Sequence, residues 1–308
     1  MDESVRSQIS NLITHIEAVR PTLEVVTNSL STKLSTFSEV EAEEQAIAYW
    51  RMQALRDALV RIDTFIERNF SYIETLGLIS LCRYTFELVV WLKHIELDER
   101  FALIYARILC KQQVELYEKL AGHLQREIDL YLSLAEEETT VHANVRAAAR
   151  TQKTAGRATV EDIRAASNLI DERLALEFAI YSDQALHNGY GFQAHLLKTQ
   201  ALQKAVSYAD ENRTFLAKFN SRWAKIIEEL KIKDWKWSAR AKHVGMESDY
   251  DFIYSYTSRL LHATPASLTT HQQSLEGQEI AMFLRYIAIQ FRWIVRHGEK
   301  RVVQLLHH

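Results

Sequence analysis

The scarcity of glycine and proline is the feature of this sequence that most constrains its fold. Only 8 Gly and 2 Pro occur in 308 residues, where average usage would give roughly 20 and 15. The turns that join β-strands draw heavily on these two residue types. The composition therefore excludes an all-β fold and argues against a parallel α/β fold, and we expect an all-α protein.

Apolar residues also recur at helical spacing along most of the chain. Examples are Ile47, Trp50 and Ala54 near the N-terminus, and Ile280 and Phe283 near the C-terminus. Intervals of three and four residues place apolar side chains on one helix face. With 47% of residues hydrophobic, the chain can bury a sizeable core. The pattern predicts an elongated bundle of about eight helices.

The sequence suggests that the chain is organised into several segments. We expect residues 1–70 to form an N-terminal helical extension, broken at Pro21, and residues 71–308 to form a helical core domain. From 139 to 160 the chain has no acidic residue and a local charge of +4. This stretch is predicted to be a flexible basic linker. A solvated loop is one interpretation, and an electrostatic contact to nucleic acid is the other, through Arg146, Arg150, Lys153 and Arg157.

Several classes of protein are excluded by absent signals. The sequence has no Gly-Lys pair for a phosphate-binding loop, no HExxH and no GxSxG. Cys82 and Cys110 form no CxxC motif, so we expect buried thiols in a reducing compartment. The stretch from Leu76 to Leu92 is interrupted by Arg83 and Glu87 and is therefore expected to be a buried helix rather than a membrane span. The sequence predicts a cytoplasmic protein with no membrane partner, no cofactor and no metal site.

Two sets of polar residues occur in stretches of sequence that are otherwise apolar and have helical spacing. Arg83 and Glu87 are four residues apart, hence on one helix face. Burying their charges is costly unless further hydrogen-bonding partners are supplied. Further along the chain, polar side chains recur at four-residue intervals in the stretch from Tyr250 to His262. We predict that the two sets meet in one buried site containing Arg83, Glu87, Tyr254, Ser258 and His262.

Two interpretations of this cluster remain open. In the first it is a polar network that fixes the register of the helices. In the second it is a catalytic site, in which His262 is the acid/base and Glu87 orients it or shares its proton. Arg83 would neutralise an anionic group such as a phosphate. Tyr254 and Ser258 would position that group.

The same stretches carry a resemblance to a protein family. Arg83–Glu87, Ala241–Gly245 and Tyr250–His262 resemble the signatures of a bacterial all-helical domain-of-unknown-function family, which pairs an Arg-x-x-x-Glu helix with a Tyr-x-x-x-Ser-x-x-x-His helix. The resemblance covers roughly residues 74–270. Some members of that family are linked to abortive infection and phage defence, so the resemblance implies a role of that kind.

Two hypotheses about function follow. In the first, the chain is an antiviral-defence or toxin-like effector that binds or cleaves RNA without a metal, since cleavage through the RNA's own 2′-hydroxyl needs only such groups. In the second, it is a non-catalytic helical scaffold or sensor that binds a protein partner encoded nearby or forms a homo-oligomer. The substitution His262→Ala separates them: it abolishes RNA cleavage in the first and lowers only the melting temperature in the second.

Overall fold

The structure is a computed structural model that describes residues 3–37, 42–69, 75–151, 157–230, 235–261 and 275–306. Every regular element within these ranges is a helix, so the predicted all-α class is confirmed. The chain divides into two compact units: unit 1 comprises residues 1–106 and 223–308, and unit 2 comprises residues 107–222. Whether residues 1–70 act as an extension of their own stays a prediction.

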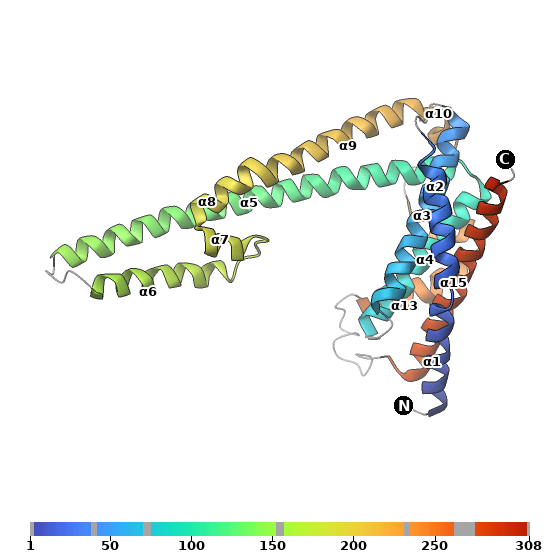
Figure 1. Ribbon diagram of the computed structural model, residues 1–308, viewed down its shortest axis with the longest axis horizontal. Helices are drawn as coiled ribbons and strands as arrows, with labels where there is room; N and C mark the ends of the chain where they lie inside the picture. Colours follow the sequence, from blue (N-terminus) through green and yellow to red (C-terminus); the bar gives the residue numbers. More distant parts are fainter. Residues whose placement is uncertain are drawn as a thin grey trace. The chain divides into compact units, whose positions relative to one another are not determined.

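Unit 1 brings together helices from both ends of the chain (Figure 1). Its N-terminal helices are α1 (Glu3–Glu17), α2 (Arg20–Leu34), α3 (Glu43–Asn69), α4 (Thr75–Leu97) and the first residues of α5 (Phe101–Thr151). Its C-terminal elements are α10 (Ala224–Glu229), α11 (Trp237–His243), α12 (Glu247–Asp249), the π-helical turn η2 (Tyr250–Tyr254), α13 (Ser255–Leu261) and α15 (Gly277–Leu306). Pro21 lies in the first turn of α2, where its missing N–H costs nothing, so α1 and α2 are separate helices.

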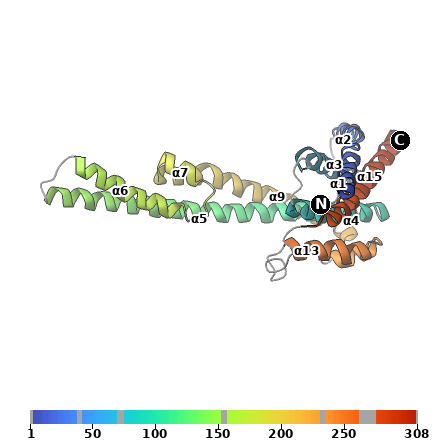
Figure 2. The same ribbon diagram turned by 90° about the horizontal axis from the view of Figure 1, so that it is seen from below.

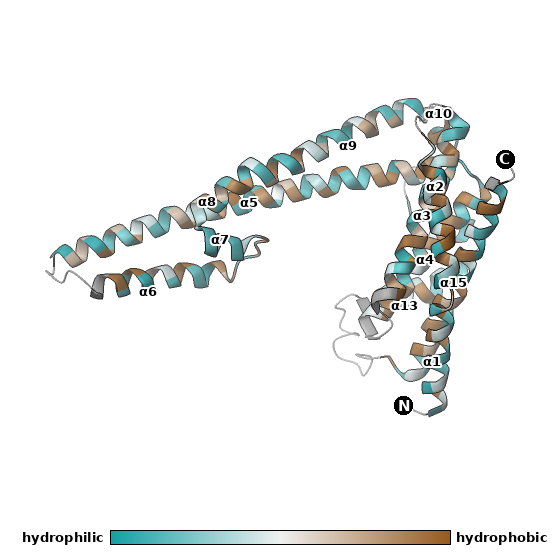
Figure 3. Cartoon of the chain, viewed as in Figure 1, coloured by the Kyte–Doolittle hydropathy of each residue, from teal (hydrophilic) through white to brown (hydrophobic). Residues whose placement is uncertain are grey.

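The core of unit 1 is built around α4 and α15. Phe86 of α4 and Phe283 and Phe291 of α15 are almost completely buried. They belong to one hydrophobic cluster with residues of α1, α2 and α3. Hydrophobic and hydrophilic residues alternate along α15 in Figure 3, as expected for a helix with one buried face.

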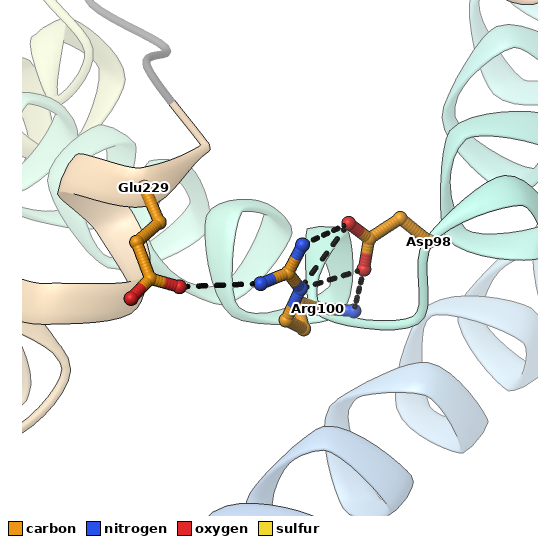
Figure 4. A network of polar contacts seen from close by, with 3 residues as sticks. All are labelled: Asp98, Arg100 and Glu229. Atoms are coloured by element: carbon orange, nitrogen blue, oxygen red, sulfur yellow. Dashed lines mark hydrogen bonds and ion pairs between the residues drawn. The ribbon is translucent and has the colours of Figure 1, made fainter.

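An acidic cap fixes the start of α5 (Figure 4). Asp98 Oδ1 accepts a hydrogen bond from the backbone N–H of Arg100 at 3.0 Å, and Asp98 Oδ2 accepts one from Arg100 Nη2 at 2.8 Å. Arg100 Nη1 donates to Glu229 of α10 at 3.3 Å. The hydrogen bonds from Arg100 lower the pKa of Asp98. The cap therefore joins the beginning of α5 to α10 within unit 1.

Unit 2 is a set of long helices that pack lengthwise. It contains the rest of α5, α6 (Arg157–Leu174), α7 (Ser182–Asn188), α8 (Tyr190–Leu196), the π-helical turn η1 (Leu197–Ala201) and α9 (Leu202–Arg222). Helix α9 runs antiparallel to α5, because Arg107 bonds Asn220 and Glu118 pairs with Arg213. In Figure 2, α6 lies alongside α5, in agreement with the bidentate pair between Arg173 and Glu137.

The stretch predicted to be a linker is helical wherever it is described. Residues 139–151 continue α5, and 157–160 begin α6. The hydroxyls of Thr139 and Thr140 donate to the carbonyls of Ala135 and Glu136 one turn earlier, so these threonines are satisfied inside the helix. Gly189 has a φ of +83° and lies between α7 and α8.

Two further expectations concern thiols and membranes. Cys82 and Cys110 are both buried and free, as the sequence predicts. Within the described ranges, none of the helices is long and apolar enough to cross a membrane.

Candidate functional site

Arg83 of α4 is the centre of a polar cluster in unit 1. Its Nε donates to Glu87 Oε1 at 3.1 Å, its Nη1 to Ser258 Oγ at 3.1 Å, and its Nη2 to Tyr254 Oη at 2.8 Å. The structure therefore brings together four of the five residues that the sequence places in one site. Each contact uses a different nitrogen of the guanidinium, so the orientation of its plane is fixed.

The cluster lies on the more open side of α4. Cys82 and Phe86 are completely buried, whereas the side chains of Arg83 and Glu87 are 24% and 27% exposed. Helix α4 is thus not buried all round, although its sequence suggests this. Because Arg83 and Glu87 are one turn apart, both lie on the same partly exposed stripe. The charges are accessible to water and to a ligand.

Tyr254 holds Arg83 through its ring as well as through its hydroxyl. The Cζ of Arg83 lies 4.3 Å from the centroid of the Tyr254 ring, within the range of a cation–π contact. The ring of Tyr254 is itself supported by Tyr250, whose ring stacks on it at 4.9 Å. Both tyrosines belong to the π-helical turn η2. Such turns occur often at functional sites.

Burial changes the proton affinity of two members of the cluster. It raises the pKa of Glu87, and the hydrogen bond and positive charge of Arg83 oppose this shift. It also raises the pKa of Tyr254, again opposed by the charge of Arg83. Glu87 therefore binds a proton more readily than an exposed glutamate does, while Tyr254 keeps its hydroxyl proton at neutral pH.

Arg83 retains capacity for a ligand. A guanidinium has five N–H donors, and the contacts within the described residues use three of them. One N–H remains on Nη1 and one on Nη2. Each of these two groups can donate to an oxygen of a phosphate or carboxylate.

Only some of the other predicted site residues lie in the part of the chain that the structure describes. His262 and Lys153 lie outside the described residues, and so does the side chain of Arg157. Arg146 and Arg150 are exposed on the last turns of α5. Their predicted contact with nucleic acid stays a prediction.

A second polar cluster, in unit 2, escaped the sequence analysis. Glu127 of α5 is 98% buried. Its carboxylate accepts hydrogen bonds from the backbone N–H groups of Ile180 and Tyr181 and from the Tyr131 hydroxyl, and it lies 2.8 Å from His123 Nε2. His123, Glu127 and Tyr131 stand at four-residue intervals in the sequence, which is the signal that could have revealed them. The cluster fixes the chain between α6 and α7.

Metal binding has no candidate in the part of the chain that the structure covers. No group of three or more His, Cys, Asp or Glu side chains there is arranged to hold an ion. Comparisons with models of protein families, with curated proteins and with solved structures find no match to this chain. The residues of the chain and their contacts are therefore the evidence for its function.

Proposed function

We propose that this protein is an antiviral-defence or toxin-like effector that cleaves RNA without a metal, at the Arg83 cluster. One observation carries the proposal. A partly exposed guanidinium is held by three side chains and a tyrosine ring, and it keeps two N–H donors for a ligand. A preorganised cation of this kind stabilises the negative charge that develops on phosphoryl oxygens in a transition state.

The proposed chemistry uses the RNA as its own nucleophile. The 2′-hydroxyl oxygen attacks the adjacent phosphorus, and the bond from phosphorus to the 5′-oxygen breaks, which leaves a 2′,3′-cyclic phosphate and a 5′-hydroxyl. Glu87 accepts the proton of the 2′-hydroxyl through Oε2, which makes no hydrogen bond within the described residues. His262 keeps its predicted acid/base role and supplies the proton to the leaving 5′-oxygen.

The roles of the remaining residues follow from their contacts. Arg83 binds two oxygens of the phosphate through its two remaining N–H groups. Tyr254 and Ser258 are positioning residues, because both hold Arg83 through their oxygen atoms. This differs from the sequence-based interpretation, in which they position the anion directly.

The test is a cleavage assay on total cellular RNA in the presence of a chelator. Arg83→Gln should lower the cleavage rate by roughly 10²–10³-fold, the effect of removing one transition-state donor. Tyr254→Phe keeps the ring and removes only the hydroxyl, so its loss should be smaller. Arg173→Gln, which breaks an exposed ion pair on α6, is the matched control. Cleavage by Arg83→Gln at the wild-type rate would overturn the proposal.

A second candidate function rests on a different observation. Leu176 and Phe178, between α6 and α7, are each 86% exposed, although Glu127 fixes the backbone a few residues later. Two large apolar side chains exposed close together on one loop favour an interaction surface there. The candidate is a scaffold that self-associates through this loop.

Light scattering after size exclusion tests this candidate. The double variant Leu176→Ser/Phe178→Ser should be monomeric where the wild type is a dimer. Val160→Ser, at an exposed apolar residue of α6, should leave the dimer intact. A monomeric wild type would remove the candidate.

A further inference from the structure

A cavity of about 300 Å³ lies in unit 1, apart from the Arg83 cluster. Side chains of α3, α4 and α15 line it, together with Glu99 before α5. One wall is aliphatic, with Met52 and Leu55 of α3 and Leu92 of α4. The other lining residues are charged or polar except Ile95. This combination of apolar wall and few polar groups is typical of small-molecule sites, and the volume is at the lower end of their range.

The charges in the cavity are not balanced. Arg51 and Arg301 are only 18% and 20% exposed, and both pair with the same carboxylate oxygen, Oε1 of Glu99. One carboxylate cannot neutralise two guanidiniums. Uncompensated positive charge that is partly buried is costly, and an anion would remove that cost.

The positive charges of the two arginines also shift the pKa values of ionisable groups in the cavity. Burial and the charge of Arg301 lower the pKa of Arg51 to about 10. His297, whose side chain is 9% exposed, also lines the cavity and faces Glu96 at 3.5 Å. Burial and the charges of Arg301 and Arg51 lower the pKa of His297, against the opposing effect of Glu96. His297 is therefore neutral at pH 7, and its ring adds no positive charge to the cavity.

We propose that this cavity binds a small organic anion, with a phosphate or carboxylate group between Arg51 and Arg301 and an aliphatic portion against Met52, Leu55 and Leu92. The two arginines are 250 positions apart in the sequence. Gln304, one turn after Arg301 on α15, accepts a hydrogen bond from Arg301 Nη1 at 3.0 Å and completes the polar side. This site is independent of the RNA chemistry proposed at Arg83.

Binding is tested by calorimetry on the full chain with four compounds, which separate the contribution of the anionic group to affinity from that of the aliphatic chain. Hexyl phosphate and hexanoate carry the same aliphatic chain with different anions, inorganic phosphate lacks the chain, and hexanol lacks the charge. At least one of the two charged amphiphiles should bind with a stoichiometry of one and raise the melting temperature. Hexanol and inorganic phosphate should bind at least tenfold more weakly. Which amphiphile binds more tightly identifies the natural anion as a phosphate or a carboxylate.

Two variants locate the site. Arg301→Gln should lower the affinity at least tenfold, while Arg285→Gln, at an exposed arginine of the same helix, should bind as the wild type does. Gln304→Glu places a carboxylate beside Arg301, so it should raise the melting temperature of the free protein and abolish binding. Arg83→Gln should leave the affinity unchanged.

The proposal is overturned if neither charged amphiphile binds, if hexanol binds as tightly as they do, or if Gln304→Glu binds them as the wild type does. A failure of RNA cleavage has no bearing on these outcomes, because the compounds and the variants concern a different set of side chains.

Discussion

His94 is a buried histidine of unit 1 whose protonation makes the stability of the fold depend on pH. Its side chain is fully buried, stacks on Phe101 at 4.6 Å and on His243 at 5.0 Å, and has its Nε2 3.1 Å from the carbonyl oxygen of Arg240. Burial lowers the pKa of His94 to about 4, against the opposing effect of the bond to Arg240. The imidazole is therefore neutral in the folded protein.

This pKa predicts a loss of stability in mild acid. In the unfolded chain His94 takes up a proton near pH 6.5, whereas in the folded protein it does so only near pH 4. Stability is therefore unaffected by His94 well above pH 6.5 and is lost as the pH falls toward 4, and the loss reaches about 2 kcal/mol at pH 5. Urea unfolding followed by tryptophan fluorescence should show the wild type losing that much more stability than His94→Gln between pH 7.5 and 5.

The control for this measurement is His15→Gln, at an exposed histidine of α1, which should behave as the wild type does. Equal losses for the wild type and His94→Gln would show that His94 is not kept neutral by the fold.

At the same scale, the convergence of four site residues could be predicted from the sequence. Arg83 and Glu87 stand one turn apart in apolar text, and the need to satisfy buried charges points to polar partners elsewhere, which Tyr254 and Ser258 supply. The cavity between Arg51 and Arg301 could not be predicted, because each residue alone is typical of a polar helix face. Only the packing of α3 against α15 brings them together.

At the scale of the element, close packing of α15 on α2 depends on one glycine. A Cβ added at Gly298 would lie 2.8 Å from Val26 Cγ1, which is too close. Gly298→Ala should therefore destabilise the protein by up to about 2 kcal/mol, since overpacking costs about 1–3 kcal/mol and alanine recovers roughly 1 kcal/mol through its helix propensity. Thermal unfolding followed by circular dichroism measures the difference.

The matched control is Gly122→Ala in α5, where nothing lies within 4 Å of the added Cβ, and this variant should be more stable than the wild type. The double variant Gly298→Ala/Val26→Ala should recover part of the loss, because it removes the atom in conflict. If Gly298→Ala were as stabilising as Gly122→Ala, the close approach of α2 and α15 would be wrong.

Helical spacing predicts most elements, and its failures have physical causes. The sequence from 139 to 160 suggests a linker because it has no acidic residue and a local charge of +4, yet α5 continues to Thr151 and the hydroxyls of Thr139 and Thr140 are satisfied inside it. The π-helical turn at Tyr250–Tyr254 follows from tertiary packing rather than from spacing. It places both Tyr254 and Ser258 on Arg83.

At the scale of the whole molecule, the division into two units predicts two unfolding transitions. All six tryptophans lie in unit 1, at positions 50, 91, 223, 235, 237 and 293. Tryptophan fluorescence therefore reports on unit 1 alone, whereas far-UV circular dichroism reports on both units. A substitution in the core of unit 2 can separate the two signals.

Glu127→Gln is the substitution that makes this separation. It puts an amide NH2 donor in place of the oxygen that accepts from either Ile180 or Tyr181, and leaving that backbone N–H unsatisfied costs about 1–3 kcal/mol. The circular dichroism transition should begin at lower urea concentration while the fluorescence midpoint stays at its wild-type value. A shift of both signals by the same amount would mean that the units unfold as one.

The central claim, that Arg83 serves RNA cleavage through the 2′-hydroxyl, is tested most directly with a pair of labelled oligonucleotides in the presence of a chelator. One is RNA, and the other carries 2′-deoxyribose at each cleaved position. We predict cleavage of the RNA to products with 2′,3′-cyclic phosphate ends and no cleavage of the substituted strand. An RNA that stays intact, or a substituted strand that is cleaved at the same rate, would contradict the claim.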